Sequence, residues 1–459
     1  MILRSIDAII QMLDADYIEN NDIEQKVMGV CIDSRKVIEG NLFIPIKGDK
    51  YNGHHYVSQA IENGAVATLW NKNEPNPPKE ITVILVEDTL EGLQKLAAVY
   101  RSQLAIKIVG ITGSNGKTST KDILAAILSK KYITQKTLGN FNNEIGVPLT
   151  ILSISEHTQI AVIEMGMENL EELDFLTHLV KPDIAIITNV GTAHLENLKT
   201  LENIAKAKME IVHGLHPHGL FIYYGDQKVL QDAVVKEQVK GSIRIKTFGE
   251  QSHNDMFIES ISQNESGLQF SINNSNIVFK MDMLGKHQGV NALSAIIAAK
   301  ELGVQEEEIQ QGLLHIEKTG MRNELLSIEQ CHILNDAYKS NPQSLIAALD
   351  TMESFDTPYK IAVLADMLDL GNESDMIHFE LGKKLSNYKL DEILTFGDMA
   401  RYITQGANQV MKNVYIRHFE DKQELVQYLK PYRLKKCMIL IKGSRGLQMD
   451  QIVESLKEV

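Results

Sequence analysis

The sequence predicts an α/β protein of three domains, the central one built on a doubly wound parallel sheet. Short apolar runs rich in β-branched residues alternate with helical patterns along most of the chain, which is typical of parallel sheets covered by helices. The length of 459 residues agrees with this, since domains commonly hold ~150 residues. New alternating blocks begin near Ile106 and Gly320, so we divide the chain into residues 1–85, 86–318 and 319–459.

The expected elements follow this division. In the first domain the expected strands are VMGVCIDS, NLFIPI, AVATLW and ITVILVED. The central domain opens with a helix-like segment, LEGLQKLAAVYRSQL, followed by the expected strands IKIVG, IAVIEM, DIAIITNV and GLFIYYG. Residues 241–283 repeat β runs and turn residues without helices, so an antiparallel attachment is expected there. The third domain is expected to be Rossmann-like, because CHILNDA, KIAVLADM, EILTFGDM and MILIKGS are each followed by a helical pattern.

The charge balance excludes broad electrostatic partners. Lys and Arg number 46 and Asp and Glu 60, which gives a formal net charge of −14. A chain this acidic lacks the basic surface that non-specific binding of nucleic acid or of anionic membranes requires. We therefore expect no nucleic-acid partner, and any anion must bind at a local site.

Cysteine use and hydropathy predict a cytoplasmic protein without membrane insertion. Cys31, Cys331 and Cys437 are far apart and show no metal-ligand spacing, so reduced buried thiols are expected. The N-terminal segment mixes charges into its apolar residues and so lacks the core of a signal peptide. No run of about 18 apolar residues, the length that crosses a membrane, occurs in the sequence.

A glycine-rich segment predicts a phosphate-binding loop. The expected strand over 106–110 is followed by TGSNGKTS and then by an amphipathic helix over 117–130. In such a loop the Lys117 ammonium meets the terminal phosphates and the Thr118 hydroxyl binds Mg²⁺. The usual GxxxxGK[ST] spacing would place a glycine where this chain has Ile111. The context favours a site for ATP or a related nucleotide over a plain strand-to-helix turn, and it leaves the reaction open.

Two further side chains stand at the carboxyl ends of expected strands, where ligands bind in open α/β sheets. Glu164 ends a strand within IAVIEM, and His194 follows DIAIITNV. A carboxylate beside Thr118 would bind Mg²⁺, whereas the commoner place of a glutamate or a loop histidine is the solvated surface. KGSR, after the run CMILI, is either a second anion-binding loop or a plain turn.

Longer motifs occur in a fixed order along the whole chain. They are DSRKVIEGNLFIPIKGDKYNGHHYVSQAIENGA, TGSNGKTSTKD, GNFNNEIGVPLTIL, IEMGM, ITNVGTAHLENLKTLENIAKAKMEI, LGKHQGVNALSA, NDAYKSNPQSLIAALD, LADMLDLG and KGSRGLQMD. With these motifs the chain resembles the Mur ligase family, whose phosphate loop reads TGxNGKT. The stretches GNFNNEIGVPLT and DAYKSNPQS make it most similar to the branch that adds D-alanyl-D-alanine to UDP-N-acetylmuramoyl-tripeptide. The DNPR-type motif of the diamino-acid branch does not occur between Gly320 and Val459.

The resemblance implies an ATP-dependent ligase. The first domain would bind the UDP end of the substrate, the central P-loop domain would bind ATP, and the third would close over ATP and bind the incoming dipeptide. The implied reaction converts the tripeptide carboxylate into an acyl phosphate, which the dipeptide amine attacks, and it releases ADP and phosphate in cytoplasmic peptidoglycan precursor synthesis. We expect a monomer that uses ATP and two Mg²⁺ ions.

Two alternatives stay open. One is a sister ligase, acting on a diamino acid or on folate. Against folate, the first domain is a full UDP-type module. The other is a nucleotide-binding regulator that kept the fold, which the intact Lys117, Glu164 and His194 oppose.

The resemblance also assigns residues by their place in the motifs. The implied catalytic set is Lys117, Glu164, His194 and Lys208, and the implied metal ligands are Thr118, Glu164, His194 and Lys208, the last as a carbamate. By pattern alone, Lys206 and Lys208 are solvated helix lysines. The implied ATP-binding residues are Thr112, Gly113, Ser114, Asn115, Gly116, Lys117, Thr118, Ser119, Asn291, Arg322 and Asp336. The implied substrate residues are Ser34, Arg35, Lys47, Gly48, Asn140, Asn142, Asn143, Tyr338, Asn341, Ser344, Lys442, Ser444 and Arg445.

Overall fold

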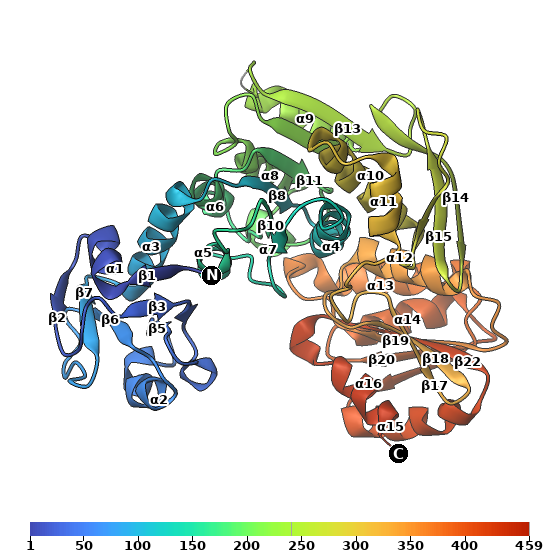
Figure 1. The fold of residues 1–459 in the computed structure, drawn as a ribbon. Helices are drawn as coiled ribbons and strands as arrows, with labels where there is room; N and C mark the ends of the chain where they lie inside the picture. Colours follow the sequence, from blue (N-terminus) through green and yellow to red (C-terminus); the bar gives the residue numbers. More distant parts are fainter. Residues whose placement is uncertain (240, 459) are drawn as a thin grey trace.

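The computed structural model describes residues 1–239 and 241–458, and its first region is a small α/β unit (Figure 1). A five-stranded sheet has the order β2-β7-β6-β5-β4, in which β4 to β7 are parallel and β2 is an antiparallel edge. The elements are β1 (Leu3–Ser5), α1 (Ile6–Leu13), β2 (Asp16–Ile18), β3 (Lys26–Met28), β4 (Val30–Cys31), β5 (Leu42–Phe43), α2 (Val57–Glu62), β6 (Ala67–Asn71) and β7 (Thr82–Val86). Strands β1 and β3 pair separately.

Helix α3 (Thr89–Gln103) joins this region to the central one. Its buried Leu96 and Tyr100 belong to one hydrophobic cluster with Ile9 of α1 and Ile151 of α5 (Gly146–Ser153). The Tyr100 hydroxyl also donates a 2.7 Å hydrogen bond to a backbone carbonyl just after α5. The predicted cut after residue 85 falls one residue before the end of β7, and the division into domains stays a prediction.

The central region contains a nine-stranded sheet of order β16-β15-β14-β13-β12-β11-β8-β10-β9. Its strands are β8 (Lys107–Thr112), β9 (Thr134–Lys136), β10 (Ile160–Glu164), β11 (Ile184–Ile187), β12 (Leu220–Tyr224), β13 (Arg244–Gly249), β14 (Met256–Asn264), β15 (Gly267–Ile272) and β16 (Phe279–Met281). Its helices are α4 (Lys117–Leu128), α5, α6 (Glu172–Val180), α7 (Leu195–Leu198), α8 (Leu201–Met209), α9 (Lys228–Glu237), α10 (Lys286–Glu301) and α11 (Glu306–Leu313).

The antiparallel attachment predicted over 241–283 is only partly correct. Strand β15 pairs antiparallel with β14 on one side and with β16 on the other, as expected. Strand β13 instead pairs parallel with β12 and extends the central sheet. The reason is the connection: α9 lies between β12 and β13 and gives the long crossover that parallel pairing needs, whereas β14 and β15 are joined by a short turn.

The central strands are buried on both faces, because helices cover each side of the sheet. All five residues of β10 are buried, and the four apolar ones alternate between two hydrophobic clusters. One cluster contains α4, α10 and α11, and the other contains α5, α6 and α8. The carboxyl ends of β8, β10 and β11 are thereby left as the open edge on which a site can form.

The third region has a six-stranded sheet of order β17-β18-β22-β19-β20-β21, parallel except for the edge strand β17. Its strands are β17 (Glu324–Ile328), β18 (Cys331–Asp336), β19 (Lys360–Ala365), β20 (Glu392–Phe396), β21 (Tyr415–Phe419) and β22 (Cys437–Lys442). Its helices are α12 (Pro342–Glu353), α13 (Ser374–Lys384), α14 (Ala400–Val410), α15 (Lys422–Leu429) and α16 (Asp450–Lys457). This agrees with the Rossmann-like arrangement predicted for the third block.

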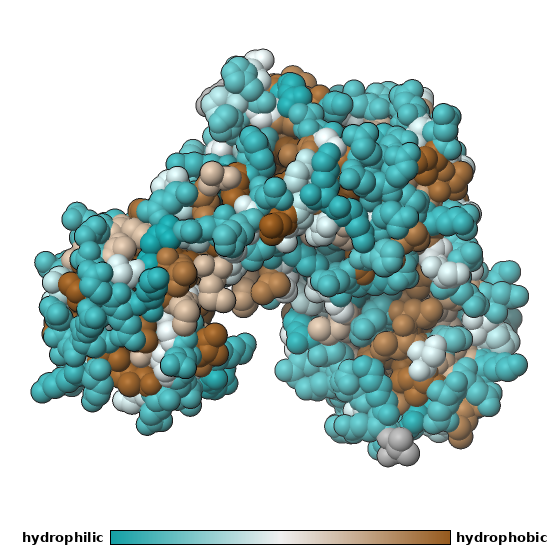
Figure 2. Space-filling model, viewed as in Figure 1, coloured by the Kyte–Doolittle hydropathy of each residue, from teal (hydrophilic) through white to brown (hydrophobic). Residues whose placement is uncertain are grey.

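The first and third regions both lie against the central one, and an open hollow separates them from each other (Figures 1 and 2). Polar side chains cover most of the face that Figure 2 shows. Within the described residues, no helix combines the length and the apolar character that crossing a membrane requires.

Candidate active site

The predicted phosphate loop lies between β8 and α4 and is anchored to the segment that follows β11. The backbone N–H groups of Ser114 and Asn115 donate to the carbonyl and to the side-chain oxygen of Asn189, each at 3.0 Å. Ser114 Oγ accepts from the Gly191 N–H at 2.8 Å. These bonds fix the loop at the open edge of the sheet.

Close packing explains the glycines of this loop. A Cβ at Gly113 would lie 1.8 Å from Thr188 Oγ1. At Gly116, where φ is 80°, a Cβ would lie 2.5 Å from Asn291 Oδ1 of α10. Larger residues therefore cannot occupy these positions without displacing their neighbours. Asn291 is itself oriented by a 2.9 Å hydrogen bond to Gln288 Oε1.

Lys117 is the first residue of α4. Its Nζ donates to the Gly113 carbonyl at 2.6 Å, across the loop. Desolvation, and next the positive charge of Lys339, lowers the pKa of Lys117 to about 8. Among the described residues, no ion pair with Lys117 counteracts this lowering of the pKa. An anion that binds near the amine would therefore stabilise its charged form.

A cavity of about 1710 Å³ extends from this loop to the third region, which is larger than most small-molecule sites. Most of the sequence-predicted residues line it: Ser114, Asn115, Gly116, Lys117, Thr118, Ser119, Asn140, Asn142, Asn143, Glu164, His194, Asn291, Arg322, Asp336, Tyr338, Ser344, Lys442, Ser444 and Arg445. Thr112, Gly113, Lys208 and Asn341 lie outside the lining. The cavity has room for more than one ligand.

Glu164 ends β10 at the cavity wall and is 1% exposed. Its Oε1 accepts from Asn142 Nδ2 at 2.8 Å, while Oε2 is buried and has no hydrogen-bond partner among the described residues. Lys121 Nζ is 3.9 Å from that oxygen. An unsatisfied carboxylate oxygen at a cavity wall is suited to a cation, although no group of three or more His, Cys, Asp and Glu among the described residues is arranged to hold a metal.

His194 and Lys208 lie near Lys117, on the neighbouring part of the sheet edge. Lys208 is 1% exposed although Lys206, two residues earlier in α8, is exposed, so the solvated alternative is wrong for Lys208. Burial, and next the charge of Lys117, lowers the pKa of Lys208 well below its ordinary value. Burial, and next the charge of Lys339, lowers the pKa of His194 to about 2. The imidazole is therefore neutral, and its Nε2 accepts from Lys339 Nζ at 3.2 Å.

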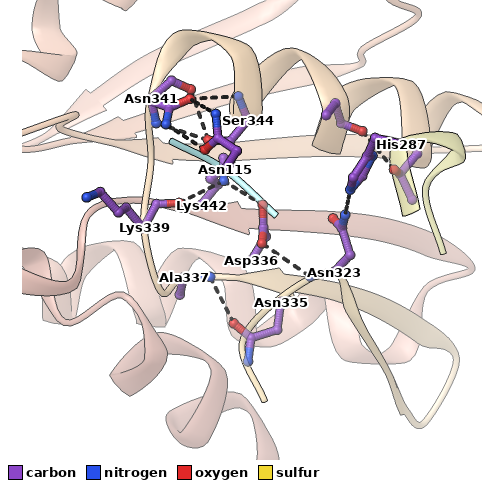
Figure 3. A network of polar contacts seen from close by, with 12 residues as sticks. Asn115, His287, Asn323, Asn335, Asp336, Ala337, Lys339, Asn341, Ser344 and Lys442 are labelled. Atoms are coloured by element: carbon purple, nitrogen blue, oxygen red, sulfur yellow. Dashed lines mark hydrogen bonds and ion pairs between the residues drawn. The ribbon is translucent and has the colours of Figure 1, made fainter. Parts of the chain in front are cut away.

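The third region brings polar side chains onto the loop (Figure 3). Asn341, which caps α12, donates through Nδ2 to Asn115 Oδ1 at 2.7 Å. Asp336, the last residue of β18, pairs with the buried Lys442 and accepts at 3.2 Å from the Asn323 N–H.

A second polar pair lies beside this network. The Arg322 guanidinium stands 4.2 Å from the centre of the Tyr338 ring, and its buried Nε has no hydrogen-bond partner within the described ranges 1–239 and 241–458. Two regions far apart in sequence thus form one polar site around the cavity.

Comparison with known proteins identifies the family. Three sequence profiles match the chain: "Mur ligase family, catalytic domain" at residues 26–101, "Mur ligase middle domain" at 111–299 and "Mur ligase, glutamate ligase domain" at 321–445. A UDP-N-acetylmuramoyl-tripeptide–D-alanyl-D-alanine ligase of Bacillus subtilis is 42% identical, covering 100% of this chain and 99% of that relative. The chain belongs to the Mur ligase family.

Solved Mur ligases have the same fold. A crystal structure of MurF from Acinetobacter baumannii superposes with a TM-score of 0.89 and 28% identity, covering 100% of both chains. MurF ligase from Thermotoga maritima, solved in complex with ADP, gives a TM-score of 0.80 and 26% identity over 94% of this chain and 97% of that one. The similarity thus covers all three regions of this Mur ligase.

The first-region residues of this Mur ligase lie apart from the cavity. Ser34 Oγ donates to Gln59 Oε1 at 2.7 Å, and Lys47 Nζ lies 3.7 Å from Glu74 Oε2. Arg35 is exposed and hydrogen-bonds Asp33, which lowers the pKa of that carboxyl to about 2. With Gly48 these residues are not part of the cavity lining, and their role stays a prediction.

Sequence reasoning missed two lysines of the site. Lys339 lies in the quoted stretch NDAYKSNPQS, and its place directly after an expected strand was the available signal. Lys121, buried beside Glu164, was hidden in a helix pattern in which polar residues are ordinarily assigned to the solvated face.

Proposed function

We propose that this chain is an ATP-dependent ligase that joins D-alanyl-D-alanine to UDP-N-acetylmuramoyl-tripeptide in the synthesis of peptidoglycan precursors. It would act in the cytoplasm, as a monomer. The observation that carries the proposal is the cavity: it places the phosphate loop, a buried carboxylate and third-region side chains together at the edge of the central sheet. The names of the 42% identical relative and of the solved MurF structures support the choice of substrates.

The proposed chemistry has two steps. The terminal phosphorus of ATP leaves the bridging oxygen of ADP and bonds to a carboxylate oxygen of the tripeptide. The dipeptide amine then attacks the acyl carbon, the bond to the phosphate oxygen breaks, and the amine loses a proton as phosphate departs. In phosphoryl transfer the protein mainly positions groups and stabilises charge, which agrees with a site rich in fixed amines and amides.

ATP would be held at the loop. Its phosphates would meet the N-terminus of α4 and Lys117, and residues 112–119 would surround them. Asn291 touches the loop at Gly116, and Arg322 and Asp336 line the same cavity from the third region. A guanidinium with an unpartnered buried Nε is well suited to a nucleotide phosphate.

Two Mg²⁺ ions are part of the proposal, and the residues present fit one of them directly. The unpartnered Oε2 of Glu164, with Thr118 on the same cavity wall, offers the oxygen ligands that Mg²⁺ prefers. At His194, a metal on Nε2 requires Lys339 to leave this nitrogen and Lys208 to carry a carbamate. Magnesium, when bound, would neutralise phosphate oxygens.

The acceptor and the dipeptide would occupy the two ends of the cavity. Asn140, Asn142 and Asn143 would face the muramoyl-peptide part, and the first-region residues Ser34, Arg35, Lys47 and Gly48 would bind the UDP end. The dipeptide or the peptide carboxylate would meet the third-region residues Tyr338, Asn341, Ser344, Lys442, Ser444 and Arg445.

Substrate choice tests the proposal against the sister reactions. With ATP and D-alanyl-D-alanine, the tripeptide nucleotide is expected to give the pentapeptide nucleotide, identified by mass. Preferential conversion of the dipeptide nucleotide with L-lysine or meso-diaminopimelate would instead assign the chain to the diamino-acid branch.

Substrate binding is expected to make the molecule more compact. The proposed UDP site and the cavity are on separate regions, so one nucleotide substrate has to contact both, and closing also excludes water from an acyl phosphate. Small-angle scattering with an ATP analogue and the tripeptide nucleotide together should give a smaller radius of gyration than either ligand alone. An unchanged radius would count against closure.

A further inference from the structure

Lys339 lines the cavity from the third region. It follows β18, and its backbone carbonyl accepts from Lys442 Nζ at 3.0 Å, which fixes the start of the side chain. In Figure 3 its side chain points away from the Asp336–Lys442 pair. It ends 3.2 Å from Nε2 of His194, a residue of the central region.

A second half-buried amine, that of Lys117, lines the same cavity. The positive charge of Lys339, after desolvation, lowers the pKa of Lys117. Glu164, Glu168 and Asp369 act on Lys339 through space, yet neither Lys339 nor Lys117 forms an ion pair within the described part of the chain. Two partly desolvated amines without a counter-charge are costly, and an anion that binds between them reduces the cost.

The position of Lys117 and Lys339 indicates the class of anion that binds between them. Lys117 begins α4, whose N-terminus attracts phosphate, and Lys339 and Lys117 line one cavity. Because the Lys339 amine reaches the central region at His194, it can meet the outer part of a phosphate chain held by the loop. We infer that Lys339 is a further catalytic residue, whose ammonium leaves His194 and binds the terminal phosphoryl oxygens of ATP.

The inference rests on the proposed function and gives Lys339 a definite task. While the terminal phosphorus moves from ADP to the substrate carboxylate, a cation on its outer oxygens stabilises the charge in transit. The alternative is structural: the Lys339–His194 hydrogen bond would merely hold two regions together. If Lys339 binds the terminal phosphate, its loss weakens binding of an ATP analogue but not of ADP. If its role is structural, the effect of its loss does not depend on the terminal phosphate.

Nucleotide binding separates these roles. Calorimetry on the full chain with Mg²⁺ would compare ADP with the non-hydrolysable imido analogue of ATP, for the unchanged protein and for Lys339→Met, which keeps the apolar stem. We expect the substitution to weaken binding of the ATP analogue about tenfold or more, as for a lost charged hydrogen bond, and to leave ADP binding within about twofold. Lys339→Arg should recover part of the loss, and Lys199→Met, at an exposed lysine five residues after His194, should bind both ligands normally.

Equal weakening of both nucleotides, or no weakening of either, would overturn the inference and leave the proposed function intact. Failure of the unchanged chain to bind either nucleotide would overturn both. Retained ADP binding by Lys339→Met serves as proof that the variant is folded.

Discussion

Replacing Lys117 with alanine is expected to lower turnover by about a hundredfold to a thousandfold without unfolding the protein. The side chain is only partly buried, and its one hydrogen bond is to the Gly113 carbonyl of its own loop, so little packing is lost. What disappears is the cation that would neutralise the terminal phosphates at the N-terminus of α4.

Steady-state ATP hydrolysis coupled to ligation measures this effect, with thermal unfolding as the check on folding. Lys130→Ala is the matched control, because Lys130 is exposed two residues beyond the other end of α4. A Lys117→Ala enzyme that works at nearly the unchanged rate would show that the loop is not the ATP site.

Replacing Lys208 with alanine is expected to lower turnover by at least about a hundredfold. Lys208 is buried and forms no ion pair with any residue that the structure describes. Burial lowers its pKa, so the neutral amine that reacts with CO₂ is favoured. The carbamate would then give the second Mg²⁺ an oxygen ligand beside His194, since hard cations prefer oxygen.

Three measurements check this account of Lys208. Formate or acetate should restore part of the activity of Lys208→Ala by filling the vacated oxygen site, and isotope-labelled bicarbonate should give a carbamate signal in the unchanged protein alone. Lys206→Ala, on the exposed side of the same helix, should be fully active. Full activity of Lys208→Ala, with no carbamate signal, would leave the second metal without its proposed ligand.

Lys206 and Lys208 show what can and what cannot be predicted from the sequence. The fold class could be predicted because a continuous apolar run such as that of β10 indicates by itself a strand that is buried on both faces. The burial of Lys208 could not, because its helical spacing is that of a solvated residue and only the packing of α8 against the sheet buries it. The parallel pairing of β13 was missed for a related reason: the run reads as a strand, but the choice of partner depends on the crossover through α9.

The candidate site likewise contains residues that the sequence predicts and residues that only the structure reveals. Glycines 113 and 116 follow from a local motif, and the structure adds the physical cause, which is contact with Thr188 and Asn291 from distant segments. The place of Lys339 after an expected strand was only a weak signal, because its importance comes from meeting His194 across a region boundary. The residues proposed for the UDP end rest on resemblance alone, since each is satisfied locally in the first region.

The central claim is that this Mur ligase activates a tripeptide carboxylate and joins it to a dipeptide. Phosphate release from ATP in the presence of UDP-N-acetylmuramoyl-tripeptide tests it most directly, with D-alanyl-D-alanine compared with single amino acids as the amine, and with the lysine and diaminopimelate forms of the tripeptide assayed separately. We predict phosphate release that requires both the tripeptide nucleotide and the dipeptide, and only background release with any single amino acid. Equal release with a single amino acid, or release independent of the tripeptide nucleotide, would contradict the claim.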